Sequence, residues 1–219
     1  MTGWLYSSVG VMRTGAGRLD ASRGSVWAAM AMKAALLLAF VVALTVPLDQ
    51  LEGKGMAFRF PLFMLSAAIV PLAWRRRFQP YPATADVLVV APFLLDTLGN
   101  LVGLYDAYDA TDDVLHTINW ILLVAAFHAW RFRRDGSAAA MSGRDAWLLG
   151  AGIGALAIVG WEIAEWIVAE TGAGGGLALT YGDTVGDLAL STAGGMLGSW
   201  LGVRYLGDFS VPSGATDLG

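Results

Sequence analysis

The sequence contains no cysteine. Its absence excludes disulfide bonds, a thiolate nucleophile and zinc sites with cysteine ligands. Lysine is almost as scarce, because Lys33 and Lys54 are the only two in 219 residues. We expect Lys33 at the start of a membrane span and Lys54 in an external loop, and neither position suits the Schiff base of a retinal protein. Charged residues make up only 15% of the chain, too few for an ordinary water-soluble domain of this size.

Most of the residues are hydrophobic instead. Hydrophobic residues make up 56% of the chain and the mean hydropathy is +0.58, values typical of an integral membrane protein. A helix needs roughly 20 apolar residues to cross the hydrocarbon layer of a bilayer. The segments that meet this requirement are 26–48, 56–74, 85–104, 113–130, 146–169 and 183–203. The sequence therefore predicts an all-α polytopic membrane protein, a bundle of six transmembrane helices.

Arginines cluster on alternate sides of the predicted spans. They precede the first span, follow the second, lie between the fourth and fifth, and follow the sixth. The positive-inside rule makes these segments and both termini cytoplasmic. We expect a cytoplasmic segment at 1–25, a transmembrane domain at 26–204 and a disordered cytoplasmic tail at 205–219. The first apolar segment is too long for a cleaved signal peptide, so we expect it to remain as a membrane span. Because every arginine cluster borders a span, nothing indicates a nucleic-acid partner.

Small residues recur along the last two spans. Gly194, Gly198 and Gly202 are four residues apart, as are Gly150 and Gly154. Such spacing lets helix backbones approach closely where lipid gives no hydrophobic drive to association. We expect these faces to pack helices together, and a homo-oligomer could use them as well.

Ionisable and polar residues occur in pairs inside the predicted spans. Each pair is three or four residues apart and therefore shares one side of a helix. The pairs are Asp112 with His116, Glu162 with Glu165, Asp183 with Asp187, and Asp96 with Asn100. All lie toward the external face except Asp96, which we expect near mid-membrane. Tyr105, Asn119 and Tyr181 are expected to extend this polar network. Charged residues are costly inside a bilayer, so their concentration at one depth predicts a functional site.

Carboxylates and a histidine on facing helices are typical of metal sites in bundles. The predicted ligands are Asp112, His116, Glu162, Glu165, Asp183 and Asp187. A divalent ion suits them, and zinc, manganese, magnesium, calcium and iron are not distinguished. Without an ion, several of the acids would be protonated. Simpler interpretations stay open for single residues: His116 as a helix-end histidine, Asp112, Asp113 and Asp183 as helix N-caps, and His128 as an interfacial side chain.

Three motifs occur in order in the second half of the chain: DDVLH at 112–116, WEIAEW at 161–166 and DTVGDL at 183–188, the last followed by Gly194 and Gly195. They resemble the Asp-x-x-x-His, aromatic-Glu-x-x-Glu-Trp and Asp-Thr-x-x-Asp motifs of the YjdF-like family of bacterial inner-membrane proteins. A looser similarity, through the histidine helix and the last helix, links the chain to VanZ-like membrane proteins. The resemblance implies a bacterial plasma-membrane location and groups the six predicted ligands as one set, but it implies no reaction.

Three functions remain open from the sequence. The first is a metal-dependent hydrolase or transferase, with Glu162 as general base, acting on a lipid or lipid-linked substrate at the outer leaflet. The second is a proton or cation transporter or channel, which Asp96 favours, although the inner half of the spans offers almost no buried ionisable group. The third is a non-catalytic role in docking another membrane protein.

Overall fold

The computed structural model describes residues 23–74, 81–131, 141–172 and 179–206, and every regular element in these ranges is a helix. The long helices are α2 (Arg23–Thr45), α3 (Met56–Trp74), α4 (Ala83–Leu101), α6 (Thr111–Arg131), α7 (Gly143–Glu170) and α8 (Tyr181–Leu201). The short ones are η1 (Asp49–Leu51), α5 (Leu104–Ala107) and η2 (Gly202–Leu206). Each predicted span corresponds to one long helix, with ends that agree within three residues. Most of the two predicted terminal segments lies outside the described residues.

Two helices end three residues earlier than the sequence predicts. Helix α2 stops at Thr45 because Val46 precedes Pro47, and the residue before a proline is disfavoured from helical geometry. Helix α4 stops at Leu101, and Gly103 adopts a φ of 70°, the left-handed conformation with which many helices end. The chain turns there and begins α5 instead of extending the span.

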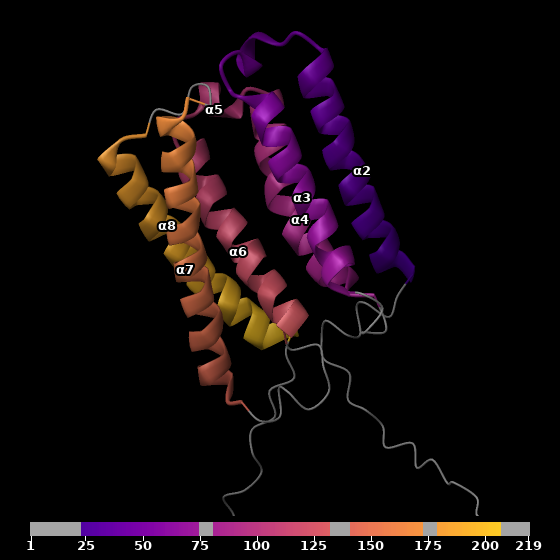
Figure 1. The fold of residues 1–219 in the computed structure, drawn as a ribbon. Coiled ribbons are helices and arrows are strands. Elements are labelled where there is room, and N and C mark those ends of the chain that lie inside the picture. The colour runs from indigo at the N-terminus through magenta and orange to yellow at the C-terminus, as the bar shows by residue number, and fades with distance from the viewer. Residues whose placement is uncertain (1–22, 75–80, 132–140, 173–178, 207–219) are drawn as a thin grey trace, which may run out of the picture.

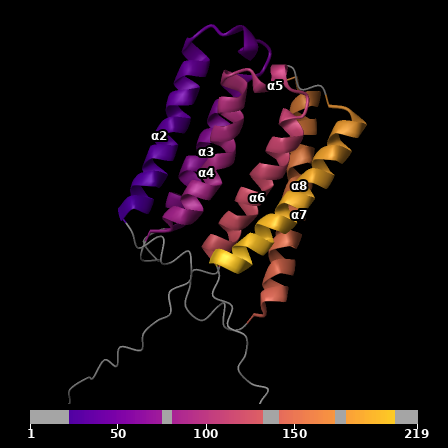
Figure 2. The ribbon, with the colours of Figure 1, turned by 180° about the vertical axis from the view of Figure 1, so that it is seen from behind.

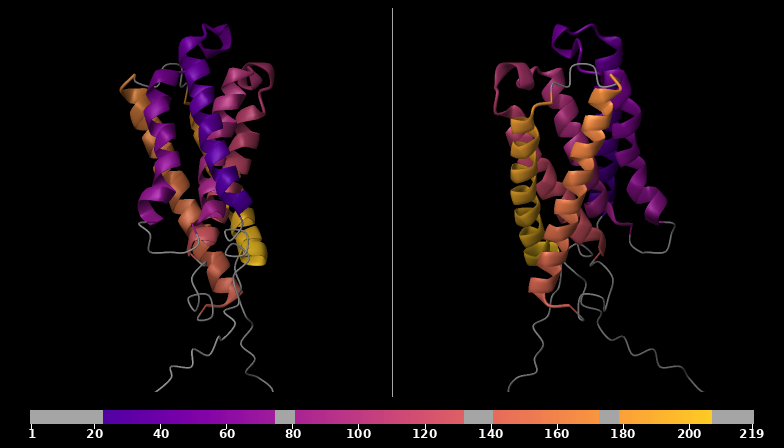
Figure 3. Two further views of the ribbon diagram at one scale, coloured as in Figure 1. Left: turned by 90° about the vertical axis from the view of Figure 1, so that its right-hand side faces the viewer. Right: turned by 60° about the vertical axis from the view of Figure 1, so that its left-hand side comes forward.

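The long helices form two layers (Figures 1 and 2). Helices α2, α4, α6 and α8 lie side by side in a row, each packed against the next. Helices α3 and α7 lie on one face of this row, α3 against α2 and α4, and α7 against α6 and α8. In the left view of Figure 3, which looks along the row, α3 and α7 both lie on the same side of it. Helix α3 therefore packs on one half of the row and α7 on the other.

The helices alternate in direction. At one end, α2, α4 and α7 begin and α3, α6 and α8 end. We call this the arginine end, because its described basic residues are Arg23, Arg131, Arg144 and Arg204. The opposite end holds η1 and α5 (Figure 1). We call it the acidic end, because it carries Asp106, Asp109, Asp112 and Asp113.

Four of the described helices, α2, α3, α4 and α7, are long and apolar enough to cross a membrane. Helices α6 and α8 have 21 residues each and are long enough, but their mean hydropathy is lower. The reason is their polar content, which includes Asp112, His116 and Asn119 on α6 and Asp187 and Ser191 on α8. The described part of the chain is thus all-helical, and its two least apolar long helices carry most of the predicted site.

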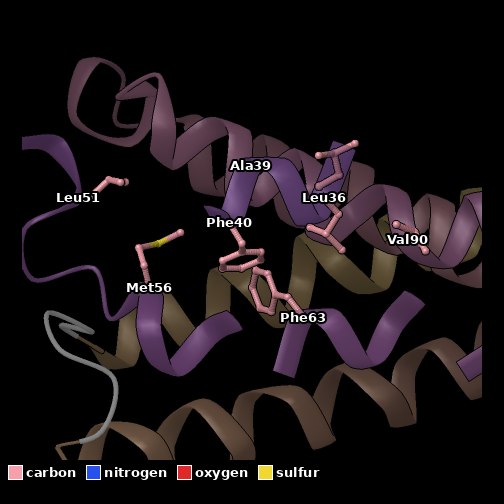
Figure 4. Packing of buried hydrophobic residues seen from close by; sticks show 8 residues of the cluster. Leu36, Ala39, Phe40, Leu51, Met56, Phe63 and Val90 are labelled. Atoms are coloured by element: carbon pink, nitrogen blue, oxygen red, sulfur yellow. The ribbon is translucent and has the colours of Figure 1, made fainter. Parts of the chain in front are cut away.

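An aromatic cluster joins α2, α3 and α4 (Figure 4). The Phe40 and Phe63 rings meet edge to face with centroids 5.9 Å apart, and Leu36 and Val90 are fully buried beside them. Phe63 also meets Phe93 edge to face at 5.0 Å. Close packing of this kind holds helices together in lipid, where burial alone gives little drive. The cluster fixes α3 relative to α4 and so positions the residues that follow on both helices.

Glycines let α8 lie directly against α6. A Cβ atom at Gly194 would clash with the carbonyl oxygen of Thr117, and one at Gly198 with that of Ile121. The predicted packing role of these glycines is confirmed. Because the glycine faces are used within the chain, an oligomer would need a different surface, and homo-oligomerisation stays a prediction.

We expect Gly198→Ala to lower the free energy of unfolding by about 1–3 kcal/mol, since the added methyl group forces the two backbones apart. The matched control is Gly186→Ala on the same helix, where a Cβ atom would meet nothing within 4 Å. There the substitution should be neutral or stabilising, because alanine favours a helix. Thermal unfolding in detergent measures both, and equal melting temperatures for the two variants would contradict this packing.

Candidate functional site

A cavity of about 600 Å³ lies between α3 and α7, with α4 and α6 behind it. Toward the middle of the bundle its lining is apolar and aromatic and includes Leu62, Phe63, Phe93, Leu123 and Trp161. Toward the acidic end the lining is polar: Lys54, Arg59, Asp96, Asn100, Tyr105, Asp112, His116, Asn119, Glu165, Asp183 and Asp187. All the predicted site residues except Glu162 and Tyr181 belong to this lining. The cavity can therefore hold a molecule with one apolar and one charged part.

Three of the predicted ligands converge at the polar end of the cavity. The Nε2 atom of His116 lies 3.9 Å from Oδ1 of Asp112 and 3.7 Å from Oδ1 of Asp187. One ligand atom from each of the three residues lies within 4.8 Å of the other two. We call Asp112, His116 and Asp187 the triad. It joins two positions one turn apart on α6 to one position on α8, where the glycine contacts hold the two helices together.

The geometry of the triad fits a divalent ion. Its separations are too long for strong hydrogen bonds, whereas two ligands of one tetrahedral ion, each about 2.1 Å from it, lie roughly 3.4 Å apart. The His116 ring is also oriented for ligation, since its Nδ1 atom lies 3.0 Å from the hydroxyl oxygen of buried Ser191. Such a partner fixes the ring and leaves Nε2 facing the two carboxylates. In the sequence, Ser191 shares a helix face with Asp187, one turn before it, but nothing there indicates that its hydroxyl contacts His116.

A second polar network surrounds Asp96. Arg59 Nη1 donates to its Oδ2 at 3.0 Å, and the Tyr105 hydroxyl donates to its Oδ1 at 2.6 Å. The Asn100 amide donates to the Asp96 carbonyl oxygen at 2.9 Å. Asp96 lies five residues from the end of α4 at the acidic end, and its depth near mid-membrane stays a prediction. Its charge is neutralised by Arg59 rather than left for an ion pathway.

Tyr105 lies on α5, outside the long helices, and reaches Asp96 because Gly99 leaves room for its ring. Burial, together with the negative charge of Asp96, raises the pKa of Tyr105 above its ordinary value. The phenol therefore stays protonated and keeps donating to the carboxylate. This bond ties the short α5 to α4 at the acidic end of the cavity.

The remaining predicted residues do not belong to the 4.8 Å cluster that forms the triad. Glu165 and Asn119 line the cavity. Asp183 also lines it and is not the N-cap of α8, because Thr180 holds that position and accepts from the Asp183 amide at 3.1 Å. Glu162 is buried outside the lining, and its Oε1 has no hydrogen-bond partner among the described residues. Tyr181 is 88% exposed.

Two buried ionisable residues, Asp86 and His128, lie in the half of the bundle toward the arginine end and contradict the sequence-based expectations. Lys33 lies in the middle of α2, and its ammonium contacts the fully buried Asp86 carboxylate of α4 at 2.6 Å. The half of the bundle toward the arginine end therefore does contain buried ionisable groups. His128 is fully buried rather than interfacial and lies 2.9 Å from the Ser199 hydroxyl. It fits there because Gly150 and Gly202 carry no side chains that would fill its place.

Comparison with known proteins gives one match. The family described as "Predicted membrane protein (DUF2238)" matches the chain over residues 28–208. The chain belongs to this family. The DUF2238 match includes residues of every long helix, so it covers the triad, the Asp96 network and the Lys33–Asp86 pair alike. YjdF is itself a DUF2238 protein, and a closer relationship to it stays a prediction. No curated protein and no solved structure matches the chain.

Proposed function

We propose that this protein is a metal-dependent hydrolase or transferase of the bacterial plasma membrane that acts on a lipid or lipid-linked substrate at the outer leaflet. The observation that carries the proposal is the position of the triad at the charged end of a cavity whose other walls are apolar. A lipid placed there would have its head group beside the triad and its chain along Leu62, Phe93 and Leu123. A cavity with one charged end and one apolar end matches the chemistry of a lipid better than that of a small polar solute.

In this proposal all six long helices cross the membrane, and the arginine end faces the cytoplasm. Helices α6 and α8 are long enough to span a bilayer, and each runs in the opposite direction to the long helix before it in the chain. The clustering of arginine at one end supports this orientation through the positive-inside rule. Both termini would then be cytoplasmic, and the triad would lie at the depth of the outer head groups.

A divalent ion held by the triad would polarise an ester or phosphoryl oxygen and favour ionisation of a bound water. A mixed nitrogen and oxygen ligand set suits zinc, manganese or iron better than calcium or magnesium, which prefer oxygen ligands alone. We assign the general base to Glu165, which lines the cavity. It replaces Glu162 in this role because the Glu162 carboxylate is buried outside the lining.

Reconstituted protein tests this function. Wild type and His116→Ala are placed in liposomes of bacterial lipid extract with zinc, manganese or iron(II), and the lipids are compared by mass spectrometry. We expect one lipid class to be consumed by the wild type in the presence of an ion and spared by the variant or by added chelator. Exposed Glu170→Gln is the control that should behave as wild type. Unchanged lipids with ion-loaded wild type would contradict the proposal and favour a docking role.

Cation or proton transport is the second candidate, and the Lys33–Asp86 pair favours it by placing ionisable groups near the arginine end. Asp86 and Asp96 lie on the same helix, ten residues or about 15 Å apart. Between them the buried positions of α4 include the apolar Val90 and Leu94, which argues against a continuous path. A pH-sensitive dye inside the same liposomes separates the two functions, because transport predicts a flux that Asp96→Asn reduces, and the enzyme proposal predicts none.

A further inference from the structure

The cavity that holds the triad also presents a guanidinium group from its opposite wall. Arg59 lies on α3, whereas the triad lies on α6 and α8, and both line the polar end of the same cavity. We propose that the cavity binds a lipid with a phosphate in its head group, held between Arg59 and the ion-bearing triad, with an acyl chain in the groove between α3 and α7. This inference rests on the proposed function and names the substrate class of the same site.

Arg59 has hydrogen-bonding capacity to spare for a phosphate. Its Nη1 atom donates to Asp96, and within the described part of the chain the guanidinium makes no other hydrogen bond. A guanidinium carries five N–H donors in a planar fork that matches phosphate oxygens. Asp96 also accepts from Tyr105, so the carboxylate keeps a partner if Arg59 shares its donors with a ligand.

Arg59 and the triad line the polar end of one cavity and can therefore act on one head group. Tyr105 lines the same end, and its hydroxyl donates to the Asp96 carboxylate that Arg59 contacts. The carboxylates of the triad would repel a phosphate by themselves, but a divalent ion between them would offset their two negative charges and offer the phosphate a cationic centre. Phosphate oxygens are ordinary ligands of such ions, so the ion and Arg59 together can hold one phosphate from two sides.

The groove is open toward the surface that the long helices present to lipid. On α3, Phe58 and Leu62 line the cavity and are 38% and 43% exposed. On α7, Gly160 and Ala164 line it and are also exposed. A Cβ atom at Gly160 would meet nothing within 4 Å, so this edge is open space. A lipid chain can therefore enter sideways from the bilayer while its head group stays at the acidic end.

Binding measurements on the full chain in maltoside micelles, with manganese present, test the inference. Three probes separate the contributions of the phosphate and the acyl chains: dioctanoyl phosphatidic acid, dioctanoylglycerol without the phosphate, and glycerol 3-phosphate without the chains. We expect phosphatidic acid to bind at least about tenfold more tightly than either of the others, as loss of one charge-assisted hydrogen bond or of a buried chain predicts. Equal binding of glycerol 3-phosphate would show a free-phosphate site, and equal binding of dioctanoylglycerol would show no phosphate recognition. Either result overturns the proposal.

Two variants and one matched control locate the ligand in the cavity. Gly160→Leu should fill the groove and weaken phosphatidic acid binding about tenfold or more. Gly152→Leu, on the same helix with equally open space but outside the lining, should leave binding unchanged. The double variant Arg59→Gln with Asp96→Asn removes both members of the ion pair, so neither charge is left unpaired. It should reduce the preference for phosphatidic acid over dioctanoylglycerol. Equal effects of the two leucine variants, or an unchanged preference in the double variant, would contradict the inference.

Metal content measured in the same samples separates this inference from the proposed function. Protein that holds its ion but binds the three probes alike overturns the inference and leaves the metal site standing. Protein that holds no ion and binds none of the probes overturns both.

Discussion

Replacing Lys33 with methionine is expected to lower the free energy of unfolding by about 3–5 kcal/mol, the usual cost of removing one partner from a buried ion pair. The lysine ammonium lies 2.6 Å from the Asp86 carboxylate, whose side chain is fully shielded. Tyr81 donates to the same carboxylate oxygen and would be its remaining hydrogen-bond donor among the described contacts. The other oxygen, Oδ1, has no hydrogen-bond partner among the described residues. The variant must therefore protonate the acid or admit water between α2 and α4.

Two controls show whether the lost charge is the cause. The double variant Lys33→Met with Asp86→Leu removes both charges and should recover most of the lost stability. Lys54→Met breaks a pair with Asp106, whose side chain is 53% exposed, and such surface pairs contribute little. Denaturant titration in mixed micelles compares the variants. If Lys33→Met unfolds with the same midpoint as Lys54→Met, the buried pair does not stabilise the bundle.

Removing His116 or its partner Ser191 is expected to have the largest effect on ion binding. His116→Ala deletes the ligand that faces both carboxylates, and binding should fall by more than about 100-fold, beyond the effect of any supporting residue. Ser191→Ala keeps the ligand but releases its ring, and losing such an outer partner typically costs about 10–100-fold in metal affinity. Competition with a chelating dye measures both affinities.

The chain contains a matched control for these two substitutions. Ser199 bonds to His128 as Ser191 bonds to His116, and both pairs join α6 to α8, but Ser199 lies toward the arginine end, away from the cavity. Ser199→Ala should therefore leave the affinity unchanged. A loss as large as that of Ser191→Ala would mean that α6–α8 packing, rather than the orientation of His116, governs binding.

The fold was predictable because each of its signals is local in sequence. Apolar length marked the six long helices, and the arginines marked which helix ends lie together. Pro47 and Gly103 account for the helix ends that were misplaced. Four of the described helices are apolar enough to count as candidate spans, whereas polar residues lower the mean hydropathy of α6 and α8. These two helices were predicted from the length of their apolar segments, with ends that agree within two residues.

The site was predictable where one helix supplies both residues. Asp112 and His116 share a face of α6 because four residues turn the helix by about 400°, close to one full turn. Glu162 and Glu165 separate because three residues turn it by only about 300°. One of them is buried outside the cavity lining, and the other lines the cavity. Spacing within a helix could not decide which member of that pair reaches the site.

The ion pairs were not predictable because each depends on the register between two helices. In the sequence, Arg59 and Lys33 lie near the predicted starts of spans, and nothing indicates a partner for either. In the structure Arg59 pairs with Asp96, 37 positions away, and Lys33 pairs with Asp86, 53 positions away. Four residues along a helix advance it by only about 6 Å, so a small shift of α3 against α4 would pair Arg59 differently. Contacts of this kind follow from packing around Phe63 and Phe93 rather than from composition.

Anomalous diffraction from crystals grown with manganese or zinc tests directly whether the triad binds an ion. We expect one anomalous peak at the acidic end of the cavity, roughly 2.0–2.2 Å from Nε2 of His116 and from a carboxylate oxygen of Asp112 and of Asp187. The same crystals of His116→Ala should show no peak there. Well-ordered wild-type crystals with no peak at the triad, or with the ion bound elsewhere, would contradict this expectation.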